Sequence, residues 1–207
     1  MLRNRAIQGM RTDRDGGIWM AQSGRTGAQA ITGRVNYLSD SAFSSNQFYS
    51  TNEGLVSRNA RSIFVDTSRT NLGGKPVVWV ASLAQVTAGV SGKGGVGTGL
   101  NTYIPVIQNY FSKESGGIDP ADGTGGAQTI GGNATEVWAF ASLNYRKSQL
   151  IRYDAVTKDS IGAYDYTNTS ALTTSFLAKS IYFDIQNNKW LGMSQNGLVV
   201  LDKNGAW

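Results

Sequence analysis

Four of the five tryptophans recur at nearly constant intervals, and this spacing limits the possible fold more than any other feature of the sequence. They stand at positions 19, 79, 138 and 190, so the intervals are 60, 59 and 52 residues. Each tryptophan lies in a short segment with the alternating pattern of a half-buried β-strand. A period of about 50 to 60 residues with several short strands in each period is typical of a propeller blade or a similar array.

A second strand candidate precedes the tryptophan strand and ends at an aspartate. The segments "RSIFVD", ending at Asp66, and "KSIYFD", ending at Asp184, match in residue type at every position. Asp184 stands six residues before Trp190. The shared pattern predicts a strand, a turn that begins at the aspartate, and then the tryptophan strand.

The other units vary this plan. Asp13 also stands six residues before its tryptophan, Trp19. Trp79 follows Asp66 by thirteen residues, so we expect an enlarged turn between them. The segment around Trp138 keeps the tryptophan strand but has no aspartate before it.

Further strand candidates complete each unit. The segments that follow the tryptophan strands are "GRVNYL", "GLNTYI", "QLIRYD" and "GLVVLD", and outer strands are expected from segments such as "NQFYST" and "IGAYDY". Radial stacking of four-stranded antiparallel sheets buries faces that a single sheet leaves exposed. We therefore predict an all-β fold, an incomplete β-propeller of about four antiparallel blades. It forms one domain over residues 1–207, with approximate blades at residues 1–40, 41–104, 105–160 and 161–207.

The repeated residues have a structural interpretation. An aspartate at the start of a turn accepts hydrogen bonds from backbone N–H groups, and a following Gly or Asn permits the left-handed conformation. The tryptophan strands alternate bulky and small residues, as closely packed positions require. We therefore assign structural rather than ligand-binding roles to Asp13, Trp19, Asp66, Trp79, Trp138, Asp184, Trp190 and Gly197. The ligand-binding residues are unknown from sequence alone.

The absence of two residue types excludes several kinds of chemistry. The chain has no Cys and no His, which removes cysteine nucleophiles, His-based triads, and thiolate or imidazole zinc sites. Disulfides are excluded too, so cysteine usage does not indicate the redox compartment. Only three Glu are present, namely Glu53, Glu114 and Glu136, and most Asp stand at turns or strand ends. No acid/base pair can be chosen by spacing, so we expect no enzyme activity, no catalytic residue, no metal and no cofactor.

Charge and hydropathy limit the partners. The net charge is +5, but Lys and Arg do not cluster with interleaved aromatics, so a nucleic-acid partner is not expected. No apolar run approaches the roughly 20 residues of a membrane span. Residues 1–7 lack the apolar region of a signal peptide. Either the protein is cytoplasmic or its true N-terminus lies outside this chain.

Two motifs suggest ligand sites but do not complete them. "SGKGGVGTGL" is similar to a phosphate-binding loop, yet Thr98 stands where a second Lys is required, and Pro105 and β-forming residues follow instead of a helix. "DRDGG" and "IDPADGTGG" are similar to calcium loops but lack the full ligand pattern and a distal Glu. We interpret these segments as an interstrand loop and as turns, respectively.

The repeats resemble a known family. "TDRDGGIWMAQSG", "GLVSRNARSIFVD" and "SIYFDIQNNKWLGMSQNGLVVLD" are similar to two-component regulator propeller repeats, which are common in extracytoplasmic proteins of Bacteroidetes. Inserts at residues 67–76, 84–98 and 112–133 depart from the compact family repeat. The family's rings have more than four blades, so the resemblance implies a fragment whose remaining blades lie elsewhere in a longer protein.

The resemblance also implies a function and a location. It predicts a non-catalytic recognition or sensor module, periplasmic or extracellular, that binds a glycan or a protein partner. A secreted or surface scaffold linked to type IX secretion is the alternative, and a propeller glycosidase or sialidase is less favoured. Tyr103, Tyr110 and Phe111 are expected in long loops, where they either stack on sugars or pack within a blade.

Overall fold

The computed structural model describes much of the chain, in segments separated by gaps. The described residues are 6–23, 34–39, 46–49, 60–70, 76–82, 99–103, 111–114, 126–142, 148–157, 160–165, 167–172, 176–195, 197–204 and 206. All the regular elements in these segments are β-strands, which confirms the predicted all-β class. In this part of the chain, no helix has the length and hydrophobicity needed to cross a membrane.

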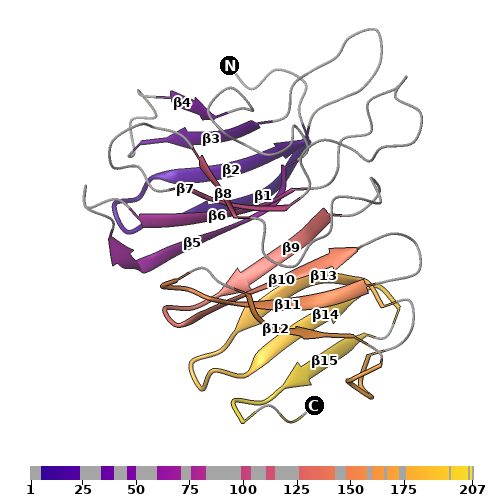
Figure 1. The fold of residues 1–207 in the computed structure, drawn as a ribbon. Helices are drawn as coiled ribbons and strands as arrows, with labels where there is room; N and C mark the ends of the chain where they lie inside the picture. The colour runs from indigo at the N-terminus through magenta and orange to yellow at the C-terminus, as the bar shows by residue number, and fades with distance from the viewer. Residues whose placement is uncertain are drawn as a thin grey trace, which may run out of the picture.

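The strands form four separate antiparallel sheets that follow one another along the chain (Figure 1). The first sheet contains β1 (Ala6–Thr12), β2 (Ile18–Ser23), β3 (Arg34–Leu38) and β4 (Asn46–Tyr49). The second contains β5 (Ala60–Thr70), β6 (Pro76–Ser82), β7 (Gly99–Tyr103) and β8 (Phe111–Glu114). The third contains β9 (Gly126–Gly132), β10 (Glu136–Ser142), β11 (Ser148–Asp154) and β12 (Ser160–Tyr164). The fourth contains β13 (Ala178–Phe183), β14 (Lys189–Met193) and β15 (Leu198–Leu201).

Each sheet is a meander in which sequential strands pair, as expected of a propeller blade. The predicted outer strands are confirmed, because β4 lies within "NQFYST" and β12 includes most of "IGAYDY". The predicted blade boundaries at residues 40, 104 and 160 are wrong. The strands β4, β8 and β12 pair with β3, β7 and β11, so each outer strand belongs to the preceding blade. The outer strands carry no tryptophan, so the periodicity did not indicate which sheet they join.

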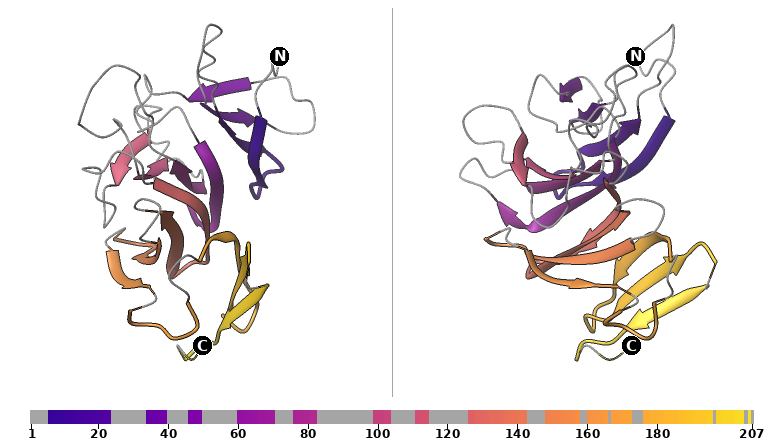
Figure 2. Two further views of the ribbon diagram at one scale, coloured as in Figure 1. Left: turned by 90° about the vertical axis from the view of Figure 1, so that its right-hand side faces the viewer. Right: turned by 45° about the vertical axis from the view of Figure 1, so that its right-hand side comes forward.

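The sheets stack so that one face of each blade covers the opposite face of the next. The inner strands β1, β5, β9 and β13 adjoin in that order, and the first and fourth sheets lie at opposite ends of the arc (Figure 2). In the first interface, Trp19 and Tyr37 share a core with Ala60 and Ile63 of the second blade. The same arrangement recurs in the next two interfaces, where Trp79 and then Trp138 meet the Ala and Ile of the following inner strand. The described residues therefore form an arc of a β-propeller.

A β-bulge in each inner strand makes this packing possible. The register skips one residue at the same place in all four strands, five positions before the turn residue at 13, 66, 133 or 184. The skipped residues are Gln8, Arg61, Gln128 and Lys179. In a regular strand, residues three apart point to opposite faces, but a bulge between them restores the same face. Ala60 and Ile63 can therefore enter one core, as they do in the first interface.

The inner strands also approach one another closely. A Cβ on Gly131 of β9 would lie 2.5 Å from the carbonyl oxygen of Ile181 in β13, and a Cβ on Gly9 of β1 would lie 3.3 Å from the Cα of Ser62 in β5. Backbone atoms cannot move aside as the end of a side chain can. Glycine at position 131 is therefore required by the separation of the third and fourth blades.

The two outermost faces of the arc are exposed. Trp190 of the fourth blade is 36% exposed, whereas the equivalent Trp19, Trp79 and Trp138 are at most 2% exposed. Tyr182 and Leu198, also in the fourth blade, are 65% and 58% exposed. At the other end of the arc, Ile7 and Met10 take the positions of Ala60 and Ile63 and are about half exposed. One end of the arc therefore exposes a tryptophan face. The other end exposes a face equivalent to the ones that pack against tryptophan in the three interfaces.

Substitution of Gly131 tests the interface between the third and fourth blades. We expect Gly131→Ala to lower the free energy of unfolding by about 1–3 kcal/mol, because the added methyl group meets backbone. Thermal denaturation followed by circular dichroism measures this. The matched control is Gly162→Ala in β12, where the nearest atom to the new Cβ is 3.6 Å away in the Tyr164 ring. Equal melting temperatures for the two variants would contradict the packing described.

Candidate functional site

The six-residue spacing between aspartate and tryptophan has a direct structural cause. In the turn after β1, Asp13 Oδ1 accepts hydrogen bonds from the backbone N–H groups of Asp15 (3.1 Å) and Gly17 (2.7 Å). Its other oxygen, Oδ2, accepts one from the Trp19 indole N–H at 3.2 Å. One carboxylate therefore closes the turn and also holds the indole of the next strand. Asp13 is buried, so these donors replace the water it gives up.

The fourth blade repeats this arrangement. Asp184 accepts from the backbone N–H groups of Gln186 (3.0 Å) and Asn188 (2.8 Å), and its Oδ2 accepts from the Trp190 indole N–H at 2.9 Å. The indole hydrogen bond is the main reason that the pKa of Asp184 lies below its usual value. The third residue after each aspartate has a positive φ, 82° at Gly16 and 68° at Asn187. The structure thus shows the predicted turn chemistry in both units.

The second blade lacks the indole contact. Asp66 Oδ1 accepts hydrogen bonds from the backbone N–H (3.0 Å) and the hydroxyl of Ser68. Among the described residues, the buried Trp79 indole N–H has no hydrogen-bond partner. Thirteen residues separate Asp66 from Trp79, so the enlarged turn does not bring the two groups together.

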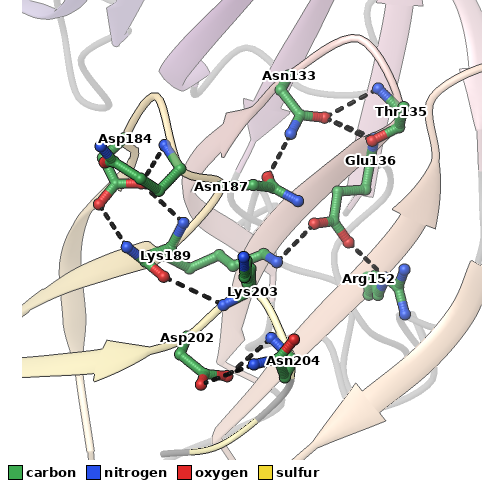
Figure 3. A network of polar contacts seen from close by, with 12 residues as sticks. Asn133, Thr135, Glu136, Arg152, Asp184, Asn187, Lys189, Asp202, Lys203 and Asn204 are labelled. Carbon is green, nitrogen blue, oxygen red and sulfur yellow. Dashed lines mark hydrogen bonds and ion pairs between the residues drawn. The ribbon is translucent and has the colours of Figure 1, made fainter.

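The third blade divides the role of the aspartate between two residues. Asn133 Oδ1 accepts hydrogen bonds from the backbone N–H groups of Thr135 (2.8 Å) and Glu136 (3.0 Å), which closes the turn. Its amide group donates to Asn187 Oδ1 in the turn of the fourth blade, at 2.6 Å (Figure 3). The carboxylate of this blade belongs to Glu136, and its side chain extends toward Lys189 of the fourth blade.

Glu136 forms a buried ion pair across the interface between these blades. Its Oε1 lies 2.8 Å from Lys189 Nζ of β14, and its Oε2 lies 2.6 Å from Arg152 Nε of β11 (Figure 3). The Glu136 and Lys189 side chains are only 5% and 6% exposed. The Lys189 ammonium also lies over the rings of Trp138 and Phe183, 6.0 and 5.7 Å from their centroids. The sequence contained no signal for this pair, because its members belong to different repeats and differ from residues at equivalent positions.

The charge state of Glu136 follows from these neighbours. Burial is the largest single contribution and by itself raises the pKa of this carboxyl group. The hydrogen bond from Lys189, the nearby Trp138 side chain and the charges of Lys189 and Arg152 together outweigh it, so the pKa lies below its usual value. Glu136 is therefore a structural anion between two cations and is unsuited to donating a proton at neutral pH.

The remaining candidate residues are placed as follows. Gly197 has a φ of 69°, and its carbonyl accepts a hydrogen bond from Met193 N–H in the turn between β14 and β15. Tyr103 and Phe111 stand opposite one another in β7 and β8, so the expected loop position is wrong for both, while the strand predicted from "GLNTYI" is confirmed over residues 99–103. Tyr110 lies outside the described residues, as do residues 91–98 and 118–125 of the incomplete motifs. In the described segments, no three acidic side chains gather into a possible metal site.

The bulges create a second polar feature, at the opposite half of the inner strands. Among the described strands, each inner strand pairs along one edge, and in a propeller its other edge lies toward the axis. We name the four skipped residues, Gln8, Arg61, Gln128 and Lys179, the bulge row. Arg61 Nη1 donates to Gln8 Oε1 at 3.4 Å, which links the row from the first blade to the second. Sequence reasoning missed this row because the bulge is visible only once strand register is known.

Comparison with known proteins supports the fold. No family model matches the sequence, and no curated protein sequence matches it. The extracellular domain of BT3049 from B. thetaiotaomicron, assigned as a hybrid two-component system, superposes with a TM-score of 0.56 at 17% identity. That of BT4673 from the same organism, assigned as a one-component or hybrid two-component system, gives TM-scores of 0.51 and 0.52 at 14% identity.

These likenesses cover nearly all of this chain but a small part of each neighbour. The match includes 96% of the chain and 22% of the BT3049 structure, and 94% of the chain and 27% of the BT4673 structures. At such identities they establish a shared fold. They agree with the resemblance drawn from the sequence, because the neighbours are extracellular domains of the class of system that gives the repeat its name.

The turn aspartate of the first blade provides one test of the repeat chemistry. We expect Asp13→Ala to lower the free energy of unfolding by about 1–3 kcal/mol, because it leaves buried N–H donors without an acceptor. Asp15→Ala is the matched control in the same turn, because Asp15 is exposed. Urea denaturation measures both. An Asp13→Ala variant as stable as Asp15→Ala would show that the turn does not depend on the carboxylate.

The buried ion pair provides a second test. We expect Glu136→Leu to lower the free energy of unfolding by roughly 3–5 kcal/mol, because it leaves the Lys189 ammonium buried without its carboxylate. The double variant Glu136→Leu/Lys189→Met is expected to recover most of this loss, since it removes the buried ammonium together with its carboxylate, and the remaining cation, Arg152, has a side chain that is 40% exposed. A double variant no more stable than the single one would contradict the pairing.

The same pair predicts a pH dependence. The folded-state pKa of Glu136 lies below its unfolded value near 4.5. Its stabilising contribution is therefore present above that unfolded value and is lost as the pH falls through the folded-state pKa. Melting temperatures measured down through this range should fall more steeply for the wild type than for Glu136→Leu/Lys189→Met.

Proposed function

We propose that this chain is part of an extracytoplasmic recognition module, a sensor propeller that binds a glycan or protein partner and performs no catalysis. The observation that carries the proposal is the shared fold with extracellular domains assigned to two-component and one-component systems. The repeats that resemble the two-component regulator propeller family point the same way. In this proposal the eight repeat residues, from Asp13 to Gly197, shape the scaffold and do not touch the ligand.

The use of the carboxylates supports a non-catalytic role. Asp13, Asp66 and Asp184 hold turns, and Glu136 holds two cations across a blade interface. Catalysis by paired carboxylates needs one group that gives up a proton and a second near the same bond. None of these four groups is placed for that task in the described part of the chain.

The exposed end faces support a partner of a particular kind. The exposed sheet face that carries Trp190 is equivalent to the tryptophan faces that are buried in the three interfaces of the arc. The exposed sheet face that carries Ile7 and Met10 is equivalent to the Ala and Ile faces that bury those tryptophans. We infer that further blades of the same type cover both of these end faces in the functional protein. The chain spans only 22% to 27% of the length of the solved structures that it matches, which is consistent with a larger assembly of blades.

A glycan array probed with the labelled full-length protein tests the proposal, with a parallel pull-down for protein partners. We expect saturable binding to a restricted set of glycans or to one protein, and no release of new reducing ends from bound glycans. The unfolded chain is the control for non-specific adsorption. Absence of any specific ligand in both assays would contradict a recognition role, and glycan cleavage would favour the glycosidase alternative.

A further inference from the structure

The apolar contacts of the three interfaces do not distinguish one blade from another. The inner strands of the second, third and fourth blades present the same pair of residues, an Ala and an Ile three positions later. In each interface this pair meets the tryptophan of the preceding blade. Equivalent surfaces can exchange partners within a chain or between copies, and such exchange is a characteristic failure of repeat proteins. A contact that differs from one interface to the next can fix the order of the blades.

The third and fourth blades meet through a contact of this kind. Glu136 stands two residues before Trp138, and Lys189 stands one residue before Trp190. Glu136 Oε1 lies 2.8 Å from Lys189 Nζ, and both side chains are at most 6% exposed (Figure 3). We name Glu136 and Lys189 the charge pair. It lies beside the apolar core that the two blades share.

The equivalent positions in the other two interfaces carry no charge. Between the second and third blades they are Val77 and Val137, which lie together in one apolar core. Between the first and second blades they are Gly17 and Val78. Among the three interfaces of the arc, the charge pair therefore marks only the one between the third and fourth blades.

A buried charge discriminates strongly between a matched and a mismatched partner. On the tryptophan face of the first or second blade, Lys189 would meet Gly17 or Val77 and would be buried without a carboxylate. If the second blade packed on the third, Glu136 would meet Val78 instead of an ammonium group. A charge that leaves water without its partner costs more free energy than a matched pair does. Each of these wrong pairings is therefore penalised.

The backbone geometry adds a second difference between the interfaces. The residue opposite the tryptophan in the inner strand is Phe64 in the second blade and Gly131 in the third. Phe64 packs against the core that the second and third blades share. At Gly131, the carbonyl oxygen of Ile181 in the fourth blade comes so close that a Cβ would lie 2.5 Å from it. A fourth blade seated as closely on the second blade would meet the Phe64 side chain.

We propose that the charge pair specifies the partner of the fourth blade. The tryptophan face of the third blade accepts the fourth blade in preference to any other described blade of the same chain or of a second copy. The Lys189 ammonium lies 6.0 and 5.7 Å from the ring centroids of Trp138 and Phe183, so aromatic rings from both blades also contact the charge. This inference goes beyond the proposed function and does not depend on it.

Co-expression of two single variants of the full-length protein tests this role. One carries Glu136→Leu and the other Lys189→Met, so each variant alone has a mismatched junction. In a dimer that exchanges the chain from the fourth blade onward, the new leucine of one copy meets the new methionine of the other. The intact Glu136 then meets the intact Lys189. Both junctions of this heterodimer are matched, which neither variant achieves alone.

The two variants carry different affinity tags, and sequential capture on both tags measures the heterodimer. We expect about tenfold more doubly tagged protein from this pair than from either variant co-expressed with itself, because only the mixed dimer relieves the buried mismatches. Light scattering gives the mass of the captured species. Wild type co-expressed with wild type under the two tags sets the baseline.

The matched control separates specificity from loss of stability. Asp13→Ala weakens the first blade and leaves the charge pair intact. When it is co-expressed with Glu136→Leu, exchange still leaves one mismatched junction, so we expect no enrichment of the mixed dimer.

The outcomes decide between a specifying and a merely stabilising pair. Mixed dimer no more abundant than the self-pairs, or equally abundant in the Asp13→Ala control, overturns the proposal. Recovery of no soluble protein from Glu136→Leu with Lys189→Met overturns it too, because the matched heterodimer should fold. None of these results bears on ligand recognition, which the glycan array and the pull-down test separately.

Discussion

The stacking of one blade on the next depends on the bulge in each inner strand. Without it, Ala60 and Ile63 would point to opposite faces, and neither face would be complete. With it, the small Ala and the branched Ile meet the indole face of the preceding blade. The same offset in β1, β5, β9 and β13 makes the three interfaces alike. The fold is therefore a series of equivalent contacts, each of which needs only its neighbour.

Polar contacts stabilise the blades at the turns that follow the inner strands β1, β5, β9 and β13. In the first and fourth blades, an aspartate holds both its turn and the indole of the next strand. In the third blade, Asn133 stands in place of the aspartate, and Glu136 pairs with Lys189 of the fourth blade and with Arg152. This contact links the third and fourth repeats. The carboxylates of Asp13, Asp184 and Glu136 are thus engaged in structural contacts.

The sequence predicted the architecture well where a residue has one dominant environment. The tryptophans, the aspartate turns and the positive-φ positions Gly16, Asn187 and Gly197 follow from local pattern, because burial and turn geometry act on neighbouring residues. The blade boundaries were misjudged, because pairing of β4 with β3 is a contact that no marker residue records. Tyr103 and Phe111 were expected in loops because they stand beside the long inserts at residues 84–98 and 112–133.

The sequence by itself determined that the chain forms repeated antiparallel sheets with an indole on one face of each. The period of the tryptophans and the alternation of apolar residues can both be read from the sequence. They are enough to predict which face of each sheet is buried. Only the tertiary structure decided which residues share an interface between blades and which charges meet across it. Register and interblade distance set both, and these depend on backbone offsets of a single residue, as at Gln8 and Arg61, that become visible only once the pairing of the strands is known.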